Sequence, residues 1–546
     1  MKLFFLLILL FTVNLYSQSV FETVDSEVYK FLERQSVTGL ISFSNEIKPL
    51  LKSEITLKLL QLDNNRSELT NTDRALLDFY LDDYRHEIKM KKKDSVYNED
   101  ARFFSSGSTG NRFRFFEYSG KHFSIFADPM ISFSYGNMFD ENLFIRRNGL
   151  RAHGYVLEDW GYDFRFFDNE ETGNRVDYGK YLIPDRGVVI TKRKPDAIEY
   201  DEVNASVTYA WSSGLLSLGK DYFSIGNARH GNIILSDKAP SFPFIRFDFF
   251  PVDWLRFFYF HGFLVSNIPD SSTFRYSSVP IRTTISDVPK FMAFHSLSIY
   301  PVKELSITIG ESIVYSEYVQ PVYFIPVMFF RVADHYLGRT NQSASGNAQM
   351  FMDASYKLTQ LGTKFYGSLF IDELSLNKLF EGKNHSAIGY TAGAEIFDPV
   401  FANSSFCIEY TKISPFVYMN SVDAQLYSNE YYKLGHWIES NGDILSVSYA
   451  QHFTRALNLQ LQGWYFRKGR TELPVEQYQS PYPPTFYGDK RNDLSMEISL
   501  SYRPYHALKA EVYYLYRSIQ DEDELRTPSA YRGTFSNFGI KLAYGF

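Results

Sequence analysis

The sequence contains a single cysteine, Cys407, among its 546 residues. The chain can therefore form neither an internal disulfide bond nor a cysteine-based metal site. Its 11 histidines are scattered without metal-ligand spacing, so we expect no metal ion and no cofactor. The net charge is −7, and no basic run is long enough to indicate nucleic acid as a partner.

Long apolar runs are also lacking. The run Leu3 to Val13 is too short to span a membrane as a helix. Lys2 before this run and Ser17 after it complete the pattern of a signal peptide, which we predict over residues 1–17. We expect an exported protein, and one that enters a membrane without long apolar helices must do so as a β-barrel.

Aromatic side chains, by contrast, are abundant. They make up 18% of the sequence, with 50 Phe and 41 Tyr, yet the mean hydropathy is only −0.25. A transmembrane barrel accounts for both values, because its strands turn apolar side chains to lipid and polar ones to the lumen. A soluble β-sandwich also shows alternation, but does not usually sustain such apolar faces over so many strands.

Residues 18–100 show the spacing of helices. Thr70 or Thr72 could cap the last helix of this region. One apolar stripe is formed by Leu76, Leu77, Tyr80, Leu81 and Tyr84. We predict a small all-α periplasmic domain here and consider it a candidate contact surface for a periplasmic protein partner.

A barrel is expected over residues 101–546, where the period changes to two. In the last strand, the alternate residues are Phe538, Ile540, Leu542, Tyr544 and Phe546. The terminal Phe546 resembles the insertion signal that outer-membrane barrels present to their assembly machinery. The barrel assembly machinery and outer-membrane lipid are therefore expected partners.

Short and long connections alternate along the barrel region. In bacterial barrels the short turns are periplasmic and the long loops external. Counting back from the last strand predicts about eighteen antiparallel strands, the first near His122–Ser134, with the segment Arg112–Tyr118 outside the count.

Two of the external connections are unusually apolar. One contains Tyr323–Phe330, and the other contains Ile233–Leu235 followed by residues 239–243. Exposing this much apolar area to water would be unfavourable. We therefore expect both connections to fold inward and plug the lumen.

Several stretches resemble the Wzi-like capsule assembly family. The main signature is Gly219–Gly226 followed by Gly231–Pro243. The segments Val28–Leu32, Tyr323–Arg339 and Gly435–Asp443 are similar to that family as well. The resemblance implies an eighteen-stranded barrel with a periplasmic helical bundle in the outer membrane of a Gram-negative bacterium. It also implies a non-enzymatic role: binding surface polysaccharide and assembling or retaining capsule at the cell surface.

The loops offer candidate polysaccharide ligands, because sugars are bound by aromatic faces and by polar or charged side chains. Each candidate could equally anchor its loop. The candidates are Arg229, His230, Asp237, His335, Tyr336, Arg339, Asn341, His436, Trp437, Glu439 and Asn441.

Three other functions stay open. RemB-type relatives of the same family imply a gliding-motility accessory role, and a wide polar lumen permits solute transport. For an outer-membrane enzyme, no catalytic constellation is recognisable in the sequence.

Overall fold

The computed structural model describes most of the chain beyond the predicted signal peptide. Phe546 and Asn341 lie outside the described residues, and nothing is described of the Arg339 side chain. The described residues are 19–92, 101–106, 113–138, 141–157, 159–276, 283–340, 345–373, 386–471, 473–479 and 481–545.

Short α-helices precede the barrel and pack around one apolar core. The predicted stripe residues Leu76, Leu77, Tyr80 and Tyr84 are buried in that core. Thr70 caps the third helix, since its hydroxyl accepts the backbone N–H of Asp73 at 3.0 Å. Within the described part of the chain, no helix has the length and apolar character to cross a membrane. The helices are α2 (Val28–Val37), α3 (Lys52–Asn64), α4 (Asn71–Asp83) and α5 (Arg85–Lys92).

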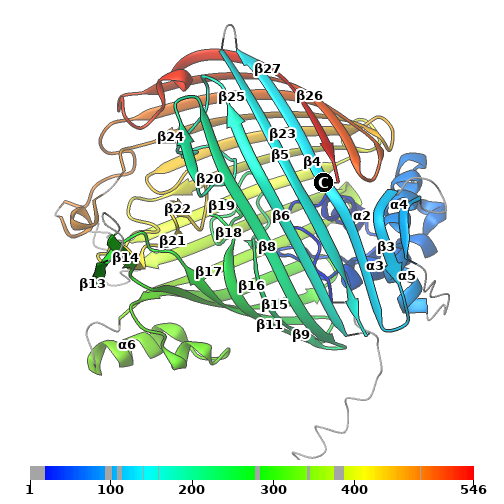
Figure 1. Ribbon diagram of the computed structural model, residues 1–546, viewed down its shortest axis with the longest axis horizontal. Helices are drawn as coiled ribbons and strands as arrows, with labels where there is room; N and C mark the ends of the chain where they lie inside the picture. Colours follow the sequence, from blue (N-terminus) through cyan, green and yellow to red (C-terminus); the bar gives the residue numbers. More distant parts are fainter. Residues whose placement is uncertain are drawn as a thin grey trace, which may run out of the picture.

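Eighteen antiparallel strands form a closed barrel (Figure 1), which confirms the predicted count. The last strand pairs with the first spanning strand and so closes the ring. The strands are β4 (Phe123–Met138), β5 (Glu141–Val156), β6 (Trp160–Thr172), β8 (Ala197–Trp211), β9 (Gly214–Asp221), β11 (Phe242–Val252), β12 (Leu255–Leu264), β15 (Lys290–Val302), β16 (Leu305–Ser316), β17 (Asn347–Leu358), β18 (Thr363–Glu373), β19 (Ala387–Phe397), β20 (Ser404–Ile413), β23 (Gly442–His452), β24 (Leu457–Lys468), β25 (Arg491–Tyr505), β26 (Leu508–Asp521) and β27 (Gly533–Tyr544).

The alternation of side chains produces an apolar outer band. On β27, Ile540 and Leu542 point outward and are about half exposed. Their cross-strand neighbours on β4, Tyr135 and Phe133, are exposed as well. Such a belt, continuous across the closing seam, is the surface that a transmembrane barrel offers to lipid.

A small hairpin lies beside the closing seam. Its strands are β2 (Arg102–Ser106) and β3 (Phe113–Ser119). β3 pairs with β4 between Ser124 and Ala127, whereas β27 pairs with β4 only from Ile131 onward. The hairpin thus covers a part of β4 that the last strand leaves unpaired, and it stands outside the eighteen, as the sequence predicts.

The connection between β9 and β11 folds into the lumen. We call residues 224–241 the inner loop. Ile233, Ile234 and Leu235 are completely buried in one core with lumen-facing rings of the wall, among them Phe258 and Phe260. This arrangement removes the apolar run from water, as expected.

The other apolar connection takes a different course. We call residues 317–340 the outer segment; it contains a 3-10 helix, η2 (Pro321–Phe324), and helix α6 (Phe330–Thr340). Figure 1 shows α6 outside the barrel. Tyr323 and Phe330 pack against outward-facing residues of β12 and β16 rather than against the lumen. The expectation that this connection also plugs the lumen is therefore wrong.

Candidate functional site

The N-terminal region and the inner loop meet inside the barrel. The two-residue strand β1 (Ile47–Lys48) precedes α3 in the chain. It pairs with β10 (Ser224–Ile225) of the inner loop. The backbone N–H of Gly226 also donates to the Glu46 carbonyl at 2.8 Å. The lumen is thus filled by two segments that are far apart in the sequence and joined by backbone hydrogen bonds.

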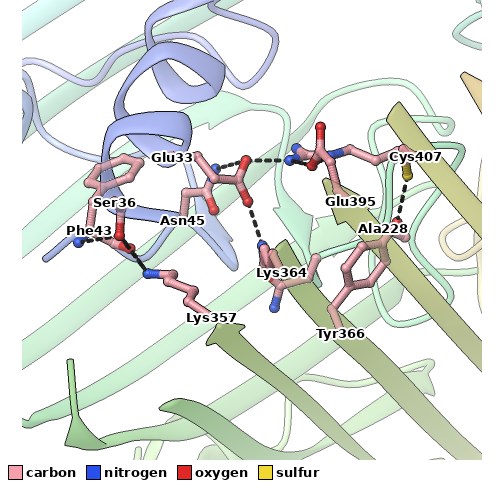
Figure 2. Close-up of polar contacts among 12 residues, drawn as sticks. Glu33, Ser36, Phe43, Asn45, Ala228, Lys357, Lys364, Tyr366, Glu395 and Cys407 are labelled. Atoms are coloured by element: carbon pink, nitrogen blue, oxygen red, sulfur yellow. Dashed lines mark hydrogen bonds and ion pairs between the residues drawn. The ribbon is translucent and has the colours of Figure 1, made fainter. Parts of the chain in front are cut away.

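A buried ionic cluster links these two segments to the wall. Arg229 of the inner loop contacts Glu33 of α2 at 2.5 Å and donates from Nε to Glu395 of β19 at 2.9 Å. Figure 2 shows Glu33 facing Lys364 of β18, with which it forms an ion pair. Burial alone would raise the pKa of Glu33, but the adjacent Arg229 and Lys364 hold it well below its usual value. Arg229 therefore acts here as a structural link, with 16% of its side chain exposed.

His230, His436 and Trp437 lie together in the part of the lumen that the inner loop helps to fill, which we call the plug. The Trp437 indole donates to the His230 carbonyl at 2.6 Å, and both Trp437 and His436 are buried. Burial lowers the pKa of His230 to about 4 and that of His436 to about 3, so both rings are neutral at pH 7. The Trp437 ring is 4% exposed and offers no open face for a sugar.

Glu439 and Asn441 hold the neighbouring external connection in place. The Asn441 side chain donates to the Arg470 carbonyl at 3.1 Å and accepts the N–H of Phe486 at 2.6 Å. Glu439 lies 3.8 Å from Lys468 and remains partly exposed. Both residues have positive φ, 59° and 55°, a backbone conformation found mostly in tight turns.

Asp237 has a different setting, because it lines a cavity. Its carboxylate pairs with Arg186 at 2.8 Å, and Arg186 also reaches Asp25 at 3.4 Å. The Arg186 guanidinium lies 4.3 Å over the Tyr222 ring. Sequence reasoning missed Arg186, since an arginine in a long polar connection carries no pattern that distinguishes it.

The cavity beside Asp237 has a volume of about 690 Å³, and we call it the outer cavity. External connections line it at residues 184–189, 240–241 and 429–430. It adjoins an inner cavity of about 330 Å³ on the side of the N-terminal helices. The residues that line both cavities are Asp25, Ser132, Arg147, Arg186, Glu202, Tyr222 and Lys541.

His335 and Tyr336 lie far from these groups. Both are exposed on α6, outside the barrel. The predicted site residues therefore do not form one cluster: some belong to the plug, Asp237 lines the outer cavity, and the α6 residues face outward.

Cys407 is buried, 3.3 Å from the Tyr366 hydroxyl (Figure 2). Among the described residues, no group of His, Cys, Asp or Glu could hold a metal ion.

Comparison with known proteins gives matches to one family and to solved barrels. A family model described as capsule assembly protein Wzi matches residues 187–531. No curated protein matches the chain. A carbohydrate-binding β-barrel, the Escherichia coli outer-membrane protein Wzi involved in group 1 capsule assembly, is 13% identical; the match covers 97% of this chain and 100% of that one, with a TM-score of 0.58.

Two further solved structures are less similar. Pseudomonas aeruginosa OprD is 11% identical over 77% of this chain and 94% of that one, with a TM-score of 0.40. Acinetobacter baumannii OccAB2 is 12% identical over 78% and 99%, with a TM-score of 0.43.

The family match and the fold agree. The matched residues make up more than half of the chain and include the inner loop, the outer segment and most of the barrel. Together with the apolar outer band, they place the protein in the outer membrane of a Gram-negative bacterium. The chain belongs to the Wzi family of capsule assembly proteins.

Proposed function

We propose that this protein binds surface polysaccharide in the outer cavity and thereby helps to assemble or retain capsule at the cell surface, without chemical change to the polymer. Family membership supports this role. The carbohydrate binding ascribed to E. coli Wzi, whose fold the chain shares, supports it as well.

The chemistry of the outer cavity suits a hydroxyl-rich and charged polymer. Arg147, Arg186 and Lys220 supply cationic donors, while Asp237 and Glu202 supply acceptors. Charged donors and acceptors make the stronger hydrogen bonds to sugar hydroxyls and carboxylates. The rings of two tyrosines also line the cavity, Tyr200 and Tyr222.

One observation carries the proposal: a cavity of about 690 Å³ lies against the external connections, in a lumen that the inner loop and the N-terminal region largely occupy. Its volume is in the range of ligand-binding pockets, roughly 300–1,000 Å³. A cavity that combines charged groups with apolar surface, in a lumen largely occupied by the inner loop and the N-terminal region, favours holding a polymer segment over passing it through.

Calorimetric titration of the purified protein with the capsule polymer of its own host tests the proposal. The variant Arg186→Gln removes a charged donor from the outer cavity, and we expect it to weaken binding about tenfold, the effect of one lost charge-assisted hydrogen bond. The matched control is Arg275→Gln, which removes the same charge from the exposed external hairpin strand β13 (Pro269–Tyr276). Equal affinities of the two variants, or no binding by the natural chain, would contradict the proposal.

The gliding-motility role and solute transport remain alternatives. Transport requires an open path, and planar-bilayer recordings measure it directly. We expect no large-pore conductance, because the inner loop and the N-terminal segment are packed within the lumen. The barrel assembly machinery, and a periplasmic partner that docks on residues 18–100, stay predictions.

A further inference from the structure

Several polar side chains point outward from the barrel wall. Glu311 lies on the same face of β16 as Ile309, which is half exposed in the apolar outer band. On the adjoining strand β15, His295 pairs with Glu311 at 3.2 Å. His261 of β12 also faces outward. An ionisable side chain that faces lipid is unfavourable unless its polar atoms are bonded.

The outer segment covers these groups. The N–H of Phe330, at the start of α6, donates to Glu311 at 2.5 Å, and that of Arg331 does so at 3.4 Å. His295 Nδ1 is 2.9 Å from the Pro326 carbonyl. The Glu311 carboxylate thus lies at the positive end of the α6 dipole, and both Glu311 and His295 are hydrogen-bonded to the outer segment.

Aromatic contacts complete the attachment. Phe324 stacks on His261 with ring centroids 4.0 Å apart. The Tyr259 hydroxyl donates to the Tyr323 carbonyl at 2.9 Å. Tyr323 and Phe330 are fully buried against the wall. The outer segment is therefore a packed part of the outer wall and not a loop in solvent.

The attachment lies deep along the strands. β15 runs inward from Lys290 at its external end, and His295 is five residues further along. At about 3.4 Å per residue this is roughly 17 Å along the strand. For a strand tilted by about 40° it corresponds to about 13 Å below the external rim, near the middle of an apolar band about 25 Å tall. Residues 326–330 therefore reach the depth of lipid acyl chains.

The side of the outer segment that faces away from the barrel is mostly apolar, although His335, toward the external end of α6, is exposed as well. Val327, Val332 and Tyr336 are 78%, 59% and 70% exposed, and Ile325 and Phe329 are exposed as well. Exposed apolar side chains gathered on one short segment indicate an interaction surface. Its depth and its continuity with the lipid-facing band identify the partner as lipid.

We propose that the outer segment is a membrane-embedded element: it is clamped to the barrel by Glu311, and its outward face contacts acyl chains of the outer leaflet. α6 then runs from mid-wall at Phe330 back toward the external rim, where β17 begins at Asn347. Residue 327 should therefore lie deeper in the membrane than residue 336.

Depth-dependent fluorescence quenching tests this proposal. In a Cys407→Ala background, an environment-sensitive fluorophore is attached to Val327→Cys, Val332→Cys or Tyr336→Cys, and the protein is inserted into phosphatidylcholine vesicles. The lipids carry a nitroxide on the acyl chain or on the headgroup, and iodide probes access from water. The matched control is Ser272→Cys, which is exposed on the external hairpin strand β13.

We expect acyl-chain nitroxide to quench most of the fluorescence at position 327, with a smaller loss at 336, and iodide to quench only the control. All labelled sites are exposed side chains, so the labels do not disturb the packed side of the segment. Iodide quenching at 327 and 332 as strong as at 272, or quenching by headgroup nitroxide alone, would show that the segment is not embedded.

Discussion

The inner loop and the outer segment are both apolar external connections, yet they lie on opposite sides of the barrel wall. The inner loop buries Ile233, Ile234 and Leu235 against lumen-facing rings and is held by Glu33 and Glu409. The outer segment packs Tyr323 and Phe330 against the outside of β12, β15 and β16 and leaves other apolar side chains exposed.

The difference shows what determines whether an apolar connection folds into the lumen or against the outside of the wall. Apolar character requires that a connection be covered, but a bilayer and a packed lumen both provide cover. Polar groups on the strands determine to which side of the wall each connection folds. Glu409 faces the lumen and accepts the backbone N–H groups of Arg229 and His230. Glu311 faces outward and accepts the backbone N–H groups of Phe330 and Arg331.

The largest expected effect comes from breaking the inner attachment. Glu33→Ala leaves the buried cations Arg229 and Lys364 without their shared carboxylate, which we expect to reduce the free energy of unfolding by about 3–5 kcal/mol. Urea unfolding in detergent micelles measures it. As a control, Asp63→Ala removes an exposed partner of Arg66 and should cost only about 0–1 kcal/mol. Equal losses would show that the buried cluster has no special role.

Breaking the outer attachment should have a smaller and local effect. Glu311→Ala leaves two N–H groups of α6 and the His295 ring without their acceptor, at a cost of about 1–3 kcal/mol. We expect faster trypsin cleavage after Arg331, with the barrel still resistant to unfolding in dodecyl sulfate at room temperature. An unchanged cleavage rate would contradict the role given to Glu311.

The two regions should also differ in their response to pH. His230 and His436 have folded pKa values of about 4 and about 3, below the usual 6.5. The unfolded chain therefore binds more protons below pH 6.5, so stability is lost as the pH falls from 6.5 toward 4. The loss approaches about 1.4 kcal/mol per pH unit for each histidine.

Variants sharpen that comparison. His230→Gln should reduce the slope of unfolding free energy against pH between 6.5 and 5, because one buried imidazole no longer titrates. His335→Gln, on the exposed side of α6, serves as the control and should leave the slope as it is. A slope that is the same in all three proteins would exclude the buried histidines as its source.

The smallest effect is expected at the outward face of α6. Tyr336→Ala removes a side chain that is 70% exposed, so the unfolding free energy in detergent should change by no more than about 0.5 kcal/mol. Thermal unfolding followed by circular dichroism measures this. A loss of several kcal/mol would mean that Tyr336 packs against the protein rather than toward lipid.

Much of the barrel could be predicted from the sequence, because alternation is a local property. Each strand shows its two faces within ten residues, as Ile540 and Leu542 do on β27, and a ring must be closed to leave no edge in lipid. The cap at Thr70 and the stripe of α4 are local for the same reason.

The candidate site could be predicted only in part. Arg229 meets Glu33 across 196 residues of sequence, and no local pattern brings them together. The direction of the outer segment did leave a signal: Glu311 and His295 interrupt outward-facing apolar positions. A charged residue in the lipid-facing register indicates that another part of the chain must cover it.

The short ladder between β1 and β10 joins the N-terminal region to a loop that enters the barrel from the external side. A displacement of the helices α2–α5 would therefore be felt by the inner loop through peptide hydrogen bonds, and by the wall through the ion pairs of Glu33 and Arg229.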